Sequence, residues 1–165
     1  MEAERYSRRT FLNRIWALVG SLAVLEIIAL VVAFFRPRQP RNATVSEDSI
    51  VVAGSVEEFE PGSVTAFVRG GFYLSRLEDG GFLALSRRCT HLSCTVPWVE
   101  NEALFVCPCH SSAFDIRGNV IAPPAPRALD LHPMAIENGV IRVDTSRLYK
   151  RAAYAPEQAT YPEPA

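Results

Sequence analysis

Four cysteines and two histidines fall into two short boxes, and this pattern restricts the fold of the 165-residue chain more than any other feature. The first box, from Cys89, reads Cys-Thr-His-Leu-Ser-Cys, and the second, from Cys107, reads Cys-Pro-Cys-His-Ser-Ser. They contribute a C-x-H and a C-x-x-H pair separated by fifteen residues, with one further cysteine in each box. Thiolates and imidazoles that converge from two loops are ligands for a soft metal centre. The chain must therefore bring two loops together at one site.

Two kinds of metal centre fit these residues. A set of two cysteines and two histidines suits one tetrahedral zinc ion, and it also suits a [2Fe–2S] cluster with two histidines on one iron. The candidate ligands are Cys89, His91, Cys107 and His110. Zinc leaves Cys94 and Cys109 unexplained, although these two could form a disulfide that joins the loops. Two plain disulfides would leave both histidines without a role, and the sequence contains no C-x-x-C-H motif for a c-type haem.

An apolar run from Ile15 to Phe35 contains one charged residue, Glu26. As a helix the run would be roughly 31 Å long, about the thickness of the hydrocarbon core of a bilayer. It is longer than the apolar region of a cleaved signal peptide, and Phe-Phe-Arg-Pro at its end is a poor cleavage context. We predict a single transmembrane helix over residues 15–35 that is retained as an anchor.

The segment before this run, Ser-Arg-Arg-Thr-Phe-Leu-Asn from Ser7 to Asn13, resembles the twin-arginine export signal. The signal pattern is Ser/Thr-Arg-Arg-x-Phe-Leu-Lys, so Asn13 is a departure. The resemblance implies export of a protein already folded around a cofactor. We therefore expect residues 1–14 on the cytoplasmic side of a bacterial inner membrane and the metal-binding part on the periplasmic side, where disulfides persist.

The remainder of the chain divides into a linker, a β-rich head and a tail. Residues 36–49 are polar and contain two prolines, which predicts an extended linker that could let the head move. Residues 50–145 show short β-rich runs between turn signals, without the amphipathic helices of a parallel α/β sheet. They predict an all-β head, an antiparallel β-sandwich. The tail, residues 146–165, could pack along the head or dock a partner.

The expected strands are bounded by recognisable turns. Asn138-Gly139 is a hairpin signal because both residues tolerate a positive φ, and Asp79-Gly80-Gly81 predicts another tight turn. The expected strands are Ile50–Ala53, Val64–Arg69, Phe72–Arg76, Phe82–Ser86, Leu104–Val106, Met134–Ile136 and Val140–Asp144.

The two boxes are similar to those of the Rieske iron–sulfur proteins of quinol-oxidising cytochrome bc-type complexes, which read C-T-H-L-G-C and C-P-C-H-G-S. The resemblance implies a Rieske-type [2Fe–2S] cluster, one per chain. It implies that Cys89 and Cys107 bind the iron that stays ferric. His91 and His110 would bind the outer, reducible iron and take part in electron and proton transfer.

The same resemblance implies roles for residues around the ligands. Cys94 and Cys109 correspond to a disulfide pair, and Ser112 corresponds to a serine whose hydroxyl bonds a bridging sulfide. Leu92 corresponds to an exposed leucine beside the histidines, at the surface that docks a partner. Pro124 belongs to a Pro-Ala-Pro loop that covers the cluster.

Several positions depart from the family pattern. Ser93 and Ser111 replace the usual glycines, so each serine carries strain if its position needs a positive φ. Pro123 replaces a glycine. Phe114 replaces a tyrosine that donates to a ligand sulfur, and losing that donor lowers the reduction potential. With Ser112 retained, we predict a potential in the middle or lower part of the roughly −150 to +300 mV Rieske range. Such a potential suits a low-potential quinol such as menaquinol.

The resemblance implies an electron-transfer subunit of an oxidoreductase complex. The chain would accept an electron and a proton from quinol beside a cytochrome b subunit and pass the electron to a c-type cytochrome. The alternative is a Rieske subunit of another membrane or periplasmic oxidoreductase, similar to arsenite oxidase. Oxygenase components and a structural zinc module are further alternatives. A formal charge of −1 and a pI near 6.3 argue against nucleic acid as the main partner.

Overall fold

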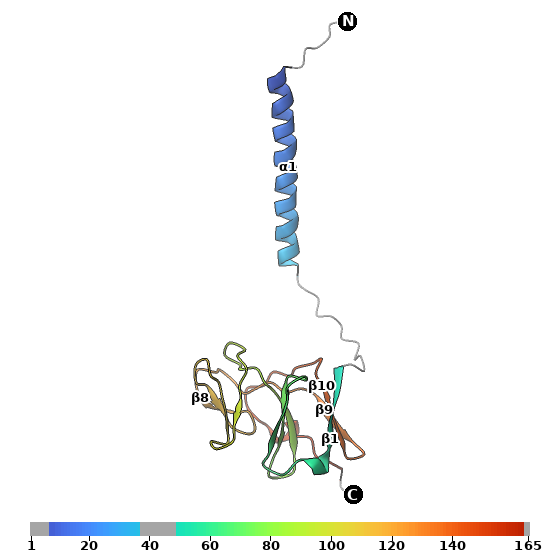
Figure 1. The fold of residues 1–165 in the computed structure, drawn as a ribbon, viewed down its shortest axis with the longest axis vertical. Helices are drawn as coiled ribbons and strands as arrows, with labels where there is room; N and C mark the ends of the chain where they lie inside the picture. Colours follow the sequence, from blue (N-terminus) through green and yellow to red (C-terminus); the bar gives the residue numbers. More distant parts are fainter. Residues whose placement is uncertain (1–6, 37–48, 164–165) are drawn as a thin grey trace. The chain divides into compact units, whose positions relative to one another are not determined.

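The computed structural model describes residues 7–36 and 49–163 (Figure 1). Its first segment is a single helix, α1 (Arg8–Phe35), which begins at Arg8 rather than at Ile15 and ends at Phe35. The Ser7 side chain caps it by accepting a hydrogen bond from the Arg9 amide at 3.3 Å. In the described ranges, α1 is the one helix that is long and apolar enough to cross a membrane. The expected linker lies almost entirely outside the described residues, as do residues 1–6.

The head, from Ser49 onward, contains short strands joined by turns. The strands are β1 (Ile50–Ser55), β2 (Val64–Phe67), β3 (Phe72–Arg76), β4 (Phe82–Ser86), β5 (Trp98–Val99), β6 (Leu104–Val106), β7 (Ala113–Phe114), β8 (Val120–Ala122), β9 (Met134–Glu137) and β10 (Val140–Asp144). Two 3-10 helices span Val56–Glu58 and Pro156–Gln158. The expected strands are all present, whereas β5, β7 and β8 were not expected. These three have only two or three residues each, too few to show an alternating pattern.

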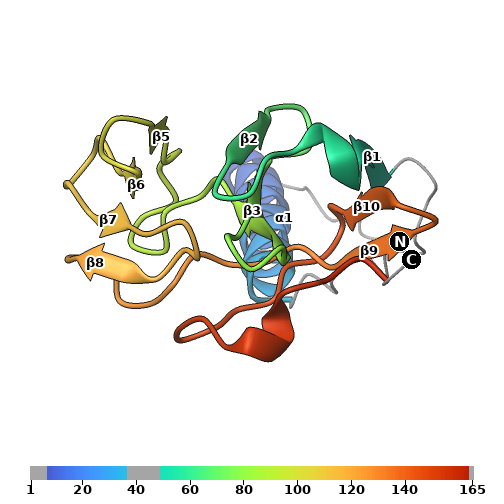
Figure 2. The same ribbon diagram turned by 90° about the horizontal axis from the view of Figure 1, so that it is seen from below.

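The strands form three antiparallel sheets with the orders β1-β10-β9, β2-β3-β4 and β5-β6-β7-β8. Figure 2 shows the first and third sheets on opposite sides of β2 and β3. The all-β, antiparallel fold class is therefore confirmed. The predicted hairpin is also present, because β9 and β10 pair across Asn138 and Gly139, whose φ angles are 51° and 76°.

Strands β3 and β4 of the middle sheet are buried on both faces. Alternate residues of a strand point to opposite faces, and here each face packs into a different core. Tyr73, Leu83 and Leu85 join the core beneath the cysteine boxes. The intervening Phe72 and Phe82 join a second core with β1, β9 and β10. Burying each such side chain contributes about 1.5–3 kcal/mol, so β3 and β4 form a rigid floor for the boxes.

The tail packs along the head, which the sequence alone left open. We call residues 149–161 the C-terminal strap; it is the red segment in Figure 2. Backbone hydrogen bonds pair Tyr149 with Leu131, and Thr160 with Phe82. The strap therefore contacts both the floor strand β4 and the segment that leads away from the site.

Candidate metal centre

The two boxes fold into loops with the same backbone hydrogen bonds. The Cys89 amide donates to the Cys94 carbonyl at 2.8 Å, and the Cys107 amide donates to the Ser112 carbonyl at 2.8 Å. In each loop the first residue is thus bonded to the residue five positions later. The two loops present their side chains from matching turns.

A serine with a positive φ closes each loop. Ser93 has a φ of 62° and Ser111 a φ of 59°, and their amides donate to the carbonyls of Cys89 and Cys107 at 2.8 and 2.9 Å. These are the two positions where the family usually has glycine. The left-handed conformation costs an L-residue roughly 1–2 kcal/mol. The strain predicted for serine at these positions is therefore present.

Cys89 and Cys107 are free thiols on the inner side of the loops, and they are only 2% and 3% exposed. Burial raises the pKa of the Cys89 thiol, and a hydrogen bond with the backbone of His91 partly opposes this rise. Metals bind the thiolate, so metal binding here would release a proton. Two adjacent buried thiols form the sulfur half of a metal site.

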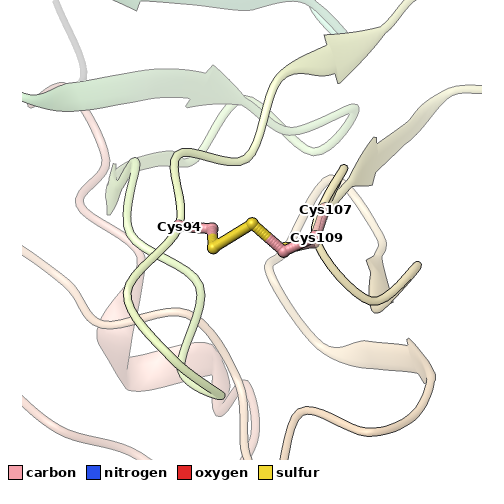
Figure 3. Close-up of side chains that lie close together, drawn as sticks. All are labelled: Cys94, Cys107 and Cys109. Carbon is pink, nitrogen blue, oxygen red and sulfur yellow. A yellow bond between two sulfur atoms is a disulfide. The ribbon is translucent and has the colours of Figure 1, made fainter.

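Cys94 and Cys109 form the predicted disulfide, with their Cα atoms 6.6 Å apart (Figure 3). The bond joins the first loop to the second. The sulfurs of Cys94, Cys107 and Cys109 all lie within 4.8 Å of one another. Because two of these sulfurs are bonded to each other, Cys107 is the one member of the group free to act as a ligand.

The two histidines come from the facing loops. The ring centroids of His91 and His110 are 5.0 Å apart, and the rings are nearly perpendicular. His110 is exposed and His91 is half-buried. Beside them Leu92 is 63% exposed, so an apolar side chain lies at the surface next to the imidazoles. The imidazoles thus lie on the solvent side of the site, and the thiols lie on the protein side.

A loop after the second box covers the site from one side. Ser112 is fully buried, and its Oγ accepts a hydrogen bond from the Ala125 amide at 3.0 Å. The Thr90 hydroxyl donates to the Arg127 carbonyl at 2.6 Å. Pro124, which immediately precedes Ala125, is exposed. The loop is therefore attached to both boxes, as a cover would be.

Phe114 forms part of the core on which the boxes rest. Its side chain is fully buried in the same core as Cys89 and Cys107. It has no hydroxyl with which to donate to a sulfur.

His132, which lies outside the boxes, is buried on β4's other side near Phe72, with ring centroids 6.0 Å apart. It therefore belongs to the other core.

The donor set fits a [2Fe–2S] cluster. The two matching loops carry two free buried thiols and two imidazoles that face each other, and the other two cysteines are engaged in a disulfide. Sequence reasoning missed Thr90, Ala125 and the strap. The hydrogen bonds of Thr90 and Ala125 each join a side-chain hydroxyl to a backbone group, and a backbone group leaves no residue-type signal.

The comparison with known proteins identifies the family. The profile of the Rieske [2Fe-2S] domain matches residues 35–136, more than half of the chain. The chain is 34% identical over 152 residues to the cytochrome b6-f complex iron-sulfur subunit of Synechococcus sp. (strain JA-3-3Ab), covering 86% of this chain and 88% of that protein. This chain belongs to the Rieske family.

Other Rieske proteins are also similar. The cytochrome b6-f complex iron-sulfur subunit of Chlorobaculum thiosulfatiphilum is 30% identical over 137 residues, covering 82% of this chain and 74% of that one. A chain from the structure of a hyperthermophilic respiratory Complex III is 25% identical with a TM-score of 0.47, and the match covers 77% of this chain and 98% of that one. As a Rieske protein the chain carries a [2Fe–2S] cluster. It is an electron-transfer protein whose relatives are subunits of membrane complexes.

Proposed function

We propose that this chain is the membrane-anchored Rieske subunit of a cytochrome bc-type complex. It would accept an electron and a proton from quinol next to a cytochrome b subunit and pass the electron to a c-type cytochrome. The observation that carries this proposal is the placement of His91 and His110 at an exposed end beside Leu92, with the thiols buried behind them. Relatives that cover most of the chain are subunits of cytochrome b6-f complexes.

In this proposal the cysteines and the histidines of the two boxes have different roles. Cys89 and Cys107 would hold one iron as thiolates, and His91 and His110 would hold the other. When bound, the cluster supplies a one-electron carrier. Each imidazole has two nitrogens, so the one that is not a ligand is free to hold a proton at the surface. We propose that the two histidines would take up a proton together with the electron.

The neighbouring residues support this transfer. The apolar Leu92 would pack against the partner and exclude water around the imidazoles. The buried Ser112 hydroxyl has its oxygen engaged by the Ala125 amide, so its hydrogen remains free to donate toward the cluster. We further propose that the head moves on residues 36–49 between its electron donor and acceptor.

The membrane topology is part of the proposal. Helix α1 would span a bacterial inner membrane with residues 1–14 in the cytoplasm. The Cys94–Cys109 disulfide favours an oxidising compartment for the head. A variant with Arg8→Lys and Arg9→Lys tests export through the twin-arginine route, measured as cluster-loaded head at the outer face. Unchanged export of this variant would show that the chain does not depend on the twin-arginine signal.

Purification of the native protein from its own membranes tests the complex. We expect the chain to copurify with b-type and c-type haem, and to show the EPR signal of a reduced Rieske cluster. Copurification with molybdenum would instead support the alternative, a subunit similar to that of arsenite oxidase. Bound zinc without an EPR signal would contradict both.

A redox titration as a function of pH tests proton coupling. The midpoint potential should fall as the pH rises, because in this proposal the reduced form holds a proton at His91 or His110 that the oxidised form releases. His132→Gln is a matched control, since this histidine lies in the other core, and it should leave the slope unchanged. A potential that stays constant up to strongly alkaline pH would contradict the role of the histidines.

A further inference from the structure

Arg151 is a buried guanidinium in the C-terminal strap, only 7% exposed. Its Nε donates to the Leu129 carbonyl at 2.8 Å, its Nη1 donates to Gln158 Oε1 at 2.8 Å, and its Nη2 donates to the Arg117 carbonyl. Among the described residues, no carboxylate forms an ion pair with it. Burial lowers its pKa to about 10. A charge buried in this way is costly unless its hydrogen bonds are made, so its geometry is tightly determined.

The two carbonyls that Arg151 binds stand at the two ends of one loop. We call residues 118–129 the cover loop. The Leu129 amide donates to the Gly118 carbonyl at 2.9 Å, which closes the loop at its base. Gly118 has a φ of 77°, and a Cβ at this position would lie 2.7 Å from Arg151 Nη2. The guanidinium therefore fits directly against the base of the cover loop.

Neighbouring strap residues hold the same base. The Ala128 amide donates to the Ala152 carbonyl at 3.1 Å. The Tyr154 amide donates to Asn119 Oδ1 at 2.7 Å. Both ends of the cover loop are thus attached to the strap, with Arg151 as the residue that contacts the two ends through one rigid side chain.

The middle of the cover loop reaches the metal site. The Ala125 amide donates to Ser112 Oγ, and the Arg127 carbonyl accepts from the Thr90 hydroxyl. A hydroxyl whose oxygen accepts a hydrogen bond becomes a stronger donor through its own hydrogen. The position of the cover loop therefore affects how strongly Ser112 donates.

We propose that Arg151 is a positioning residue for the cluster, which acts through the cover loop on the Ser112 hydroxyl. The strap thus contributes to the reduction potential of the site although, among the described residues, none of its hydrogen bonds goes to a candidate ligand. This inference rests on the proposed function only in the assignment of the cluster to the two boxes. It is independent of the identity of the quinol and of the electron acceptor.

The test is Arg151→Lys in the full chain, loaded with cluster and solubilised in detergent. Lysine keeps the charge, but its single ammonium cannot reproduce the planar fork that contacts both carbonyls. We expect the reduction equilibrium to fall about threefold, which is about 28 mV at 59 mV per tenfold change. We also expect faster hydrogen exchange in the 118–129 peptide by mass spectrometry. An unchanged potential, or unchanged exchange in this peptide, would overturn the inference.

Two further variants separate positioning from general destabilisation. Val143→Ala opens a space in the other core and destabilises the head without touching the cover loop, so it should leave the potential unchanged. In a Ser112→Ala background, Arg151→Lys should cause no further fall in potential. A fall as large as in the wild-type background would show that Arg151 does not act through Ser112.

The inference can be tested even if Arg151→Lys does not take up the cluster. Gln158→Leu removes one acceptor of the guanidinium and leaves both carbonyl contacts available. It should lower the potential by a smaller amount and speed exchange in the cover loop, and no change in either would overturn the inference. Absence of a Rieske EPR signal from the wild-type chain would instead refute the proposed function.

Discussion

Replacing Ser111 by glycine should stabilise the head, because the serine is held at a φ of 59°. A non-glycine residue in this region costs roughly 1–2 kcal/mol. Glycine removes that cost, but it also increases the conformational entropy of the unfolded chain, which lowers the free energy of unfolding by about 0.4–1 kcal/mol. Among the described residues the Ser111 hydroxyl makes no hydrogen bond that would be lost. The net gain is about 0.5–1 kcal/mol, and the melting temperature should rise by about 2–4 °C.

The assay is thermal unfolding of the full, cluster-loaded chain in detergent at a fixed scan rate, followed by circular dichroism in the far-UV and visible ranges. Ser111→Ala is the matched control, because alanine loses the hydroxyl but keeps the Cβ that causes the strain. Ser93→Gly should behave like Ser111→Gly, since its φ is 62°. If Ser111→Gly melts no higher than Ser111→Ala, the left-handed conformation is not the source of strain and the reasoning fails.

Four more predictions concern the head. Burial lowers the pKa of His132, so the unfolded chain binds more protons than the folded chain below about pH 6.5, and stability falls as the pH falls. His132→Gln should therefore reduce the loss of melting temperature between pH 7.5 and 5. An equal loss in the variant and the wild type would contradict this role of His132. Ser112→Ala should lower the midpoint potential by about 40–130 mV, from a hydrogen bond of about 1–3 kcal/mol, whereas a titration showing no fall would argue against a donor at the cluster. Phe114→Tyr should raise the potential in the same titration, provided that the new hydroxyl reaches a sulfur, and a fall would exclude that geometry. Replacing Cys94 and Cys109 by alanine removes a disulfide that spans 15 residues and should lower the free energy of unfolding by about 3 kcal/mol. The visible cluster signal should then be lost faster on heating. An unchanged rate would show that the disulfide does not hold the loops together.

Local patterns predicted the parts of this protein that depend on local physics. The apolar run predicted α1, because length and composition alone decide whether a helix can cross a bilayer. Asn138-Gly139 predicted the β9–β10 hairpin, because few residues tolerate its φ angles. The spacing of the boxes predicted the candidate ligands of the metal site. The spacing alone fits either a zinc ion or a [2Fe–2S] cluster, and only the resemblance to the Rieske family favours the cluster.

The remaining features depend on contacts between distant segments. Strands β5, β7 and β8 have two or three residues each, and they exist because β6 and the loops beside it bring them into register. The strap was ambiguous in sequence because many of its hydrogen bonds, including two from Arg151, involve backbone carbonyls, which every residue has. Arg151 lies 22 residues from Leu129 and 34 from Arg117.

The sequence by itself therefore determined the chemistry of the site, since cysteine and histidine are the residue types that supply thiolate and imidazole ligands. Its environment was decided by the tertiary structure. Burial of the thiols, exposure of the histidines and attachment of the cover loop all follow from how the boxes rest on β3 and β4 and from where the strap returns. Burial and backbone hydrogen bonding are properties of the packed chain, and no single segment of sequence carries them.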